Sequence, residues 1–109
     1  MDGFFTHRSR TLEPLFVQHN VSLVFNGHDH FYERIKPQKG IVYFVVGSGG
    51  KLSPGDLDVS SPLTARGFDT DYAFLAGEVF DDQLVVNAVS RTGQIVDSGI
   101  ISRRQPPAK

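Results

Sequence analysis

Two short apolar runs place the strongest constraint on how this chain of 109 residues can fold. Residues 21–25 read VSLVF and residues 41–46 read IVYFVV, and both have the length of a strand rather than of a helix. Strands with apolar residues at consecutive positions are usually covered on both faces. The chain therefore needs packing layers above and below this pair of strands.

One helix is predicted before the first of these strands, over residues 10–18. Four residues share the spacing of a single helical face: Leu12, Leu15, Phe16 and His19. Pro14 is tolerated only in a first turn, where its missing N–H has no intrahelical partner, so we expect the helix to begin near residues 10–11. His19 then lies at the helix end, where the helix dipole favours an imidazolium and predicts a structural role.

The second half of the chain reads as an antiparallel meander. Residues 73–80, 84–90 and 94–102 are predicted strands separated by short turn signals. Residues 28–34 are expected to form a short polar segment, and residues 51–71 a long loop rich in Pro, Gly, Ser and Asp. Residues 1–102 are expected to form one domain portion, followed by a flexible tail over residues 103–109.

This order of elements indicates an α/β or α+β sandwich. Since only one helix is available to cover two apolar strands, we expect part of the core to be missing. A net charge of -1 and a pI near 6.4 argue against a nucleic-acid-binding or anionic-membrane surface. No apolar run approaches the roughly 20 residues of a membrane span, and the N-terminus lacks the pattern of a signal peptide.

The chain contains no cysteine. This excludes disulfides, zinc–thiolate sites, iron–sulfur clusters and thiol catalysis. It leaves the compartment unknown, because a chain without cysteine tolerates any redox environment.

The most informative stretch for function is Asn26-Gly27-His28-Asp29-His30. Two imidazoles separated by one residue point the same way if the backbone is extended, so they can reach one metal or two neighbouring metals. The stretch follows a buried strand, where open α/β sheets place ligand sites. Gly27 is expected to allow the bend, and Asp29 to orient a histidine or to bind metal itself. A pair of surface histidines in a turn is the alternative.

Residues 21–34 (VSLVFNGHDHFYER) resemble the last motif of the calcineurin-like metallophosphoesterases. They are most similar to the purple acid phosphatase branch, in which a strand leads into Gly-His-x-His and then Tyr-Glu-Arg. Residues 12–16, 41–50 and 74–102 resemble the flanking family elements. The resemblance implies the C-terminal part of a four-layer α-β-β-α sandwich.

The same resemblance implies the chemistry of the site. His28 would bind one metal of a dinuclear centre and His30 the other, with Fe, Zn or Mn as the metals. Such a centre polarises the phosphoryl oxygens of a phosphate ester and activates a water or hydroxide that attacks phosphorus. No side-chain nucleophile is then needed.

The family's other ligand motifs are absent from these 109 residues. Those motifs are Asp-x-His or Asp-x-Gly, Gly-Asp-x-x-Asp/Tyr, Gly-Asn-His-Asp/Glu and a further lone histidine. Two imidazoles cannot supply the roughly eight to ten ligand atoms of a dinuclear centre. We therefore expect this segment to act with a missing N-terminal half of the same domain, to be inactive alone and to self-associate. The alternative is a non-catalytic β-rich interaction or subunit module that retains the motif.

Three other features receive structural interpretations. His7 is expected to be an exposed loop residue. Residues 47–53 (GSGGKLS) do not match the spacing of a phosphate-binding P-loop, so a turn is predicted. In the full fold this turn could border the metal site. Four loop carboxylates do not match the spacing of a calcium loop and are expected to be solvated: Asp56, Asp58, Asp69 and Asp71.

Overall fold

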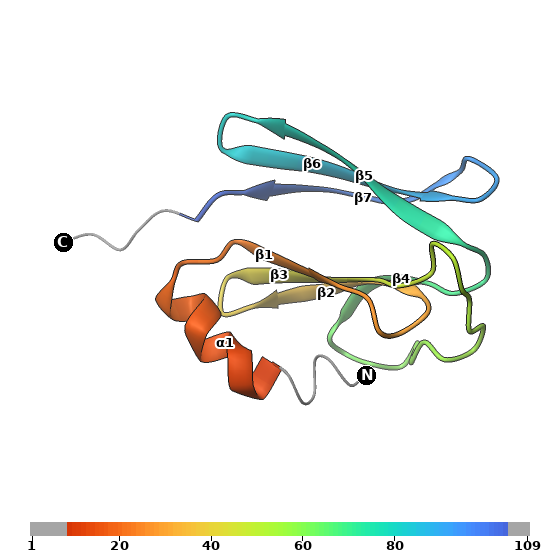
Figure 1. Cartoon of the computed structure of the whole chain (residues 1–109), viewed down its shortest axis with the longest axis horizontal. Coiled ribbons are helices and arrows are strands. Elements are labelled where there is room, and N and C mark those ends of the chain that lie inside the picture. The colour runs from red at the N-terminus through yellow and green to blue at the C-terminus, as the bar shows by residue number, and fades with distance from the viewer. Residues whose placement is uncertain (1–8, 105–109) are drawn as a thin grey trace.

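The computed structural model describes residues 9–104, which form one helix and seven strands (Figure 1). The elements, in chain order, are α1 Ser9–Gln18, β1 Leu23–Asn26, β2 Tyr32–Gln38, β3 Ile41–Val46, β4 Thr64–Phe68, β5 Ala73–Phe80, β6 Gln83–Ser90 and β7 Ile95–Ser102. No helix in this described range is both long and apolar enough to cross a membrane.

The strands form two sheets. The first has the order β1-β3-β2-β4, in which β1 runs parallel to β3 and the other pairs are antiparallel. The second is the antiparallel meander β5-β6-β7, which confirms the predicted strands in the second half. Because β1 and β3 are parallel, the loops that follow them leave the sheet at the same edge.

The apolar sequence of β3 follows from its cover on both faces. On one side lies a core packed against α1 residue Phe16, and its buried members are Phe31, Ile35, Ile41, Tyr43, Val45 and Leu57. On the other side lies a core between the two sheets, with Tyr32, Phe44, Ala73, Val86, Ala88 and Ile101. Figure 1 shows the resulting layers of helix, sheet and sheet.

Three layers of the expected four-layer α-β-β-α sandwich are therefore present in residues 9–104, and a second helical layer is not among them. The meander covers β3 on the side opposite α1, so the missing part of the expected core does not lie over this strand. Uncovered apolar side chains lie instead on the outer face of the meander, where Phe74, Phe80 and Ile100 are more than half exposed.

Two strands were not predicted. β2 begins in the expected polar segment and continues beyond it to Gln38, and β4 lies in the expected loop. Tyr32 and Glu33 of β2 are buried and have partners, which their sequence does not reveal. Glu33 is 2% exposed and accepts a hydrogen bond from the Thr64 hydroxyl in β4.

A different polar contact joins the first sheet to the second. Arg34 Nε lies 2.8 Å from Asp97 Oδ2, and the Tyr32 hydroxyl donates to the same carboxylate at 2.6 Å. Burial alone would raise the pKa of Asp97, but the hydrogen bonds from Arg34 and Tyr32 outweigh it and the pKa is lowered. The charged carboxylate therefore stabilises the packing of β7 against β2.

The helix begins earlier than predicted. It starts at Ser9, so Pro14 lies inside it rather than in its first turn. Tertiary contacts overcome the poor helix propensity of proline. Glu13 accepts a hydrogen bond from the Tyr43 hydroxyl at 3.2 Å, and the Phe16 ring packs 6.5 Å from the Tyr43 ring.

The start of the predicted tail is held against the first sheet. The Arg104 N–H donates to the Ser22 hydroxyl at 2.9 Å, and the Arg104 carbonyl accepts from the Asn20 side chain at 3.1 Å. Residues 105–109 lie outside the described range, as does His7.

Candidate metal-binding edge

Two loops meet at the edge where β1 and β3 end. We call residues 27–31 the histidine turn and residues 47–53 the glycine loop. The Gly47 N–H donates to the Phe31 carbonyl at 3.1 Å, and the Ser53 N–H donates to the His30 carbonyl at 3.0 Å. The Ser53 hydroxyl also lies 3.4 Å from His30 Nδ1. Both ends of the glycine loop therefore hold the C-terminal part of the histidine turn, at His30 and Phe31.

The histidine turn is bent at His28 and not, as predicted, at Gly27. The Asp29 N–H donates to the Gly27 carbonyl at 2.8 Å, which closes a three-residue turn around His28 with φ at 67°. A non-glycine residue in this region is strained, and strained residues cluster at functional sites. Gly27 has no positive φ, and a Cβ there would have no neighbour within 4 Å.

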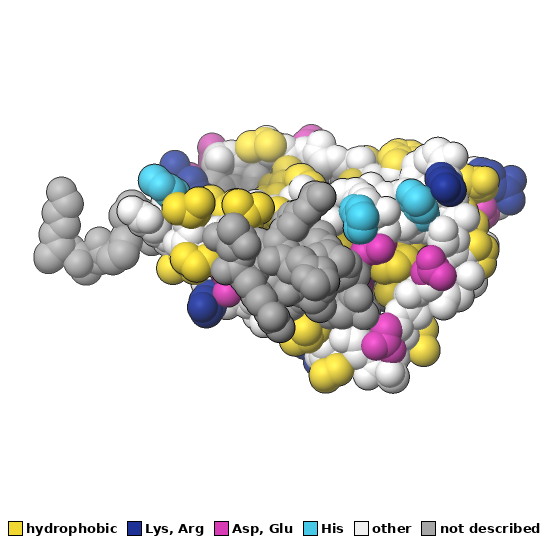
Figure 2. Space-filling model, turned by 60° about the horizontal axis from the view of Figure 1, so that its bottom comes forward, with side chains coloured by type: hydrophobic (Ala, Val, Ile, Leu, Met, Phe, Trp, Pro, Cys, Tyr) yellow, Lys and Arg dark blue, Asp and Glu magenta, His cyan; other side chains and the backbone are white. Residues whose placement is uncertain are grey.

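The bend also removes one premise of the metal-binding prediction. The backbone between His28 and His30 is not extended, so a shared direction of the two rings does not follow from strand alternation. His28 is exposed and His30 is half-buried, so neither ring is enclosed in the core. Metal binding by His28 and His30 stays a prediction. Figure 2 shows histidine side chains reaching the surface on one face.

Gly47 is the glycine that this edge requires. A Cβ at residue 47 would lie 1.8 Å from the Asp29 carbonyl oxygen and 2.9 Å from its carbonyl carbon. No real side chain tolerates such a contact with backbone, so only glycine allows the glycine loop to pack on the histidine turn. The glycine-rich run is apparent in the sequence, but this contact is not.

Unpartnered polar atoms gather at the same edge. Asn26 Oδ1, Asp29 Oδ2 and Ser48 Oγ are buried and have no hydrogen-bond partner among the described residues. Each such atom costs about 1–3 kcal/mol, so native structures keep few of them without a reason such as a bound water or ion. Their position beside the strained His28 marks this edge as the candidate functional site.

The donor set fits part of a metal centre. The ring of His28 has no hydrogen bond to any residue the structure describes. In the ring of His30, Nδ1 lies beside the Ser53 hydroxyl, and Nε2 has no hydrogen bond to the described residues. Imidazole nitrogens of this kind suit Zn, Fe and Mn. Residues 9–104 nevertheless contain no group of three or more His, Cys, Asp or Glu side chains able to hold a metal ion.

The loop carboxylates have local partners instead. Asp58 accepts hydrogen bonds from the Ser60 N–H and hydroxyl, and Asp69 accepts from the Gly55 N–H at 2.9 Å. The hydrogen bond from the Arg91 guanidinium is the main cause of the lowered pKa of Asp71. These contacts agree with the interpretation of surface loop residues.

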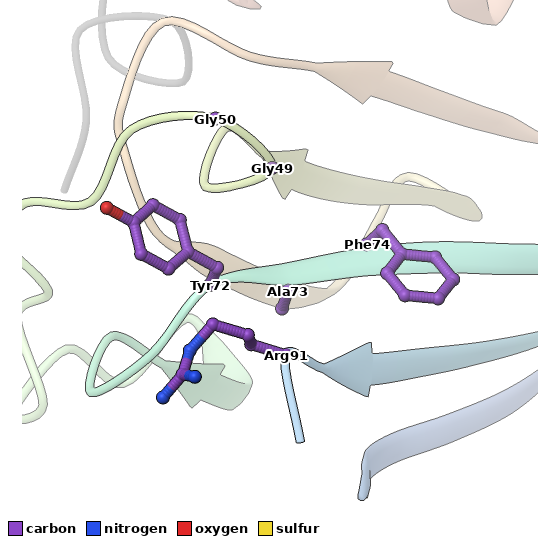
Figure 3. A pocket seen from close by; sticks show the side chains of 6 residues that line it. All are labelled: Gly49, Gly50, Tyr72, Ala73, Phe74 and Arg91. Atoms are coloured by element: carbon purple, nitrogen blue, oxygen red, sulfur yellow. The ribbon is translucent and has the colours of Figure 1, made fainter. Parts of the chain in front are cut away.

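A pocket that the sequence did not predict opens on the other side of the glycine loop (Figure 3). Its volume is about 380 Å³, and it is lined by Gly49, Gly50, Tyr72, Ala73, Phe74 and Arg91. The Ala73 N–H donates to the Ser48 carbonyl at 3.3 Å, which fixes the glycine loop to β5. The glycine loop therefore contacts the histidine turn through Gly47 and lines the pocket through Gly49 and Gly50.

Comparisons with known proteins place the chain among phosphoesterase-like proteins. A curated protein of Arabidopsis thaliana, "Probable inactive purple acid phosphatase 24", is 32% identical over 111 residues, covering 85% of this chain and 18% of the relative. No family model matches the chain. The chain is thus related at the level of the family to purple acid phosphatase-like proteins, and it spans less than a fifth of that relative's length.

A solved structure shows the same fold. The structure titled "GAP50 the anchor in the inner membrane complex of Plasmodium" matches with a TM-score of 0.78 and 21% identity, over 92% of this chain and 31% of that chain. The arrangement of helix and sheets described above is therefore found within a larger protein.

Proposed function

We propose that this chain contributes His28 and His30 to a dinuclear metal centre that hydrolyses phosphate esters, within a longer protein. The remaining ligands would come from sequence outside these 109 residues. The observation that carries the proposal is the strained histidine turn at the shared end of two parallel strands, in a chain related to purple acid phosphatase-like proteins.

The described residues would act by orienting the two imidazoles. The Ser53 hydroxyl beside Nδ1 of His30 leaves Nε2 as the ligand atom, since the contact to Nδ1 fixes the ring. The close contact of Gly47 with Asp29 holds the backbone between the two histidines in place. When bound, metals of this kind (Fe, Zn or Mn) polarise a phosphoryl oxygen and lower the pKa of a bound water.

Metal content tests the proposal directly. In the full-length protein, His28→Ala and His30→Ala should each lose bound metal, measured by mass spectrometry of the elements, together with hydrolysis of phenyl phosphate. His19→Ala is the matched control, because His19 is an exposed histidine at the end of α1. Undiminished metal content and hydrolysis in both turn variants would refute the proposal.

The alternative is a non-catalytic β-rich interaction or subunit module that retains the motif. The name of the Arabidopsis relative, a probable inactive phosphatase, favours it. The two functions differ in one measurement on the unmodified full-length protein. Absence of bound metal and of phosphate-ester hydrolysis, in a protein purified without chelators and supplied with Fe, Zn and Mn, would establish the module and exclude the enzyme.

A further inference from the structure

We propose that the pocket beside the glycine loop binds a planar aromatic group of the substrate, the part of the ester that leaves when phosphate is released. The inference rests on the proposed function for the reaction, but its binding chemistry lies within the described residues. We call the six residues that line this cavity the aryl pocket: Gly49, Gly50, Tyr72, Ala73, Phe74 and Arg91.

The position of the aryl pocket links it to the histidine turn. Gly47 touches the Asp29 backbone, Ser48 accepts a hydrogen bond from Ala73, and Gly49 lines the pocket. Three consecutive residues thus run from the histidine turn to the pocket. In this proposal, an ester whose phosphoryl group lies at the histidine turn would extend its organic group past the glycine loop into the pocket.

The size of the aryl pocket suits a ring. A cavity of about 150 Å³ is enough to bind benzene, and small-molecule sites start at about 300 Å³. A volume of about 380 Å³ therefore admits a substituted ring or a fused pair of rings. Gly49 and Gly50 project no side chains, and a Cβ at Gly50 would have no neighbour within 4 Å, so this wall is flat and open.

The side chains of the aryl pocket favour an aromatic group over a simple anion. Figure 3 shows Tyr72 and Arg91 extending to the same end of the pocket, while the Phe74 ring lies at the other. Arg91 Nε is 2.9 Å from Asp71 Oδ1, so the positive charge is already balanced by a carboxylate. A guanidinium held in this way still offers a planar surface for stacking on a ring.

The arginine is also held by its own backbone. The Arg91 N–H donates to the Tyr72 carbonyl at 2.9 Å, so the two residues at this end of the pocket are joined directly. Its guanidinium has five N–H donors, of which the contact to Asp71 uses the one on Nε. The others suit a polar substituent on the bound ring, such as a nitro or carboxylate group.

Binding by the chain without metal tests the inference. In NMR titrations of the ¹⁵N-labelled chain, 4-nitrophenol should give saturable shifts at the amides of Gly49, Gly50 and Ala73 and at Arg91 Nε. Cyclohexanol, of similar size but not planar, should give much smaller shifts. Equal shifts with both compounds, or none with 4-nitrophenol, would overturn the proposal, as would inorganic phosphate shifting the Arg91 signal while 4-nitrophenol does not.

Two variants localise the effect. Arg91→Met keeps the length of the side chain but removes the stacking plane, and should weaken 4-nitrophenol binding at least fivefold. Arg103→Met is the matched control, because Arg103 is an equally exposed arginine paired with an aspartate, Asp82. Equal affinities in the two variants would refute a role for Arg91.

Kinetics in the full-length protein separates this inference from the proposed function. Tyr72→Ala should raise KM for phenyl phosphate and leave KM for glycerol phosphate unchanged. Hydrolysis with no change in either KM would refute the aryl pocket and leave the proposed function standing. Binding of 4-nitrophenol without any hydrolysis would support the pocket and refute the proposed function.

Discussion

Replacing Gly47 by alanine should damage the candidate site without touching a metal ligand. The added Cβ would lie 1.8 Å from the Asp29 carbonyl oxygen, whereas real Cβ contacts are essentially never below 3.0 Å. The glycine loop and the histidine turn must therefore separate by at least about 1.2 Å, which is the difference between these two distances. Both partners are backbone, so no side-chain rotation relieves the clash.

Overpacking of this kind costs about 1–3 kcal/mol of unfolding free energy. For a domain of this size that lowers Tm by about 5–20 °C, measurable by circular dichroism on heating. Separation would also break the Gly47 to Phe31 and Ser53 to His30 hydrogen bonds. Full-length Gly47→Ala protein should consequently hold less metal than wild type, since a displacement of 1 Å in a site can reduce its function about a hundredfold.

Gly50→Ala is the matched control, because it lies in the same loop and its Cβ would have no neighbour within 4 Å. Its stability should stay within about 0.5 kcal/mol of wild type. Equal Tm values for Gly47→Ala and Gly50→Ala would refute the packing argument. Normal metal content in a clearly destabilised Gly47→Ala protein would instead separate the loop contact from the site.

Four further predictions concern stability and association. Asp97→Asn should cost about 1–3 kcal/mol in urea unfolding, because Asp97 is nearly buried and Arg34 loses its charged partner, whereas the exposed Asp82→Asn should cost less than about 0.5 kcal/mol. Folding lowers the pKa of Asp97, so the stabilisation by its carboxylate is complete above the unfolded pKa of 3.8 and is lost as pH falls below that value. The urea midpoint of the wild-type protein, measured between pH 3 and 7, should show this loss. An identical pH profile for Asp97→Asn would contradict the prediction. Phe44→Ala removes a fully buried ring and should cost about 3–5 kcal/mol, so retention of the wild-type urea midpoint would be a clear failure. We propose that the chain self-associates through the outer face of the meander; light scattering should detect oligomers that Ile100→Lys weakens, and a wild-type monomer at high concentration would disprove it.

Local sequence patterns predicted the helix and those strands whose apolar residues follow a regular spacing or form a continuous run. The helix and the meander have apolar periodicities, and β1 and β3 have continuous apolar runs, although Phe25 of β1 is half exposed. β2 was missed because its buried polar residues are satisfied by distant partners. Arg34 pairs with Asp97, 63 positions away, and Glu33 with Thr64, 31 positions away, and a window of neighbouring residues contains neither partner.

The candidate site was predicted in the same uneven way. The histidines were found because His-x-His after an apolar strand is a local pattern. The bend at His28 in place of Gly27 was not, because the strain depends on how the glycine loop packs against the turn. The aryl pocket combines Gly50, Tyr72 and Arg91 from three separate segments. The pairing of β5 with β6 brings Tyr72 and Arg91 together, and the hydrogen bond from Ala73 to Ser48 adds the glycine loop.

From the strand order of the first sheet we predict the order in which its parts fold. β2 and β3 are joined by a two-residue turn at Lys39 and Gly40, both with positive φ, and such hairpins form within microseconds. β1 does not pair with β2, the next strand in the chain. It pairs with β3, on the side of β3 opposite β2, so we expect it to join the sheet after the hairpin of β2 and β3 has formed. The histidine turn, which connects β1 to β2, thus acquires its geometry late, and its amides should exchange with solvent deuterium sooner than those of β3.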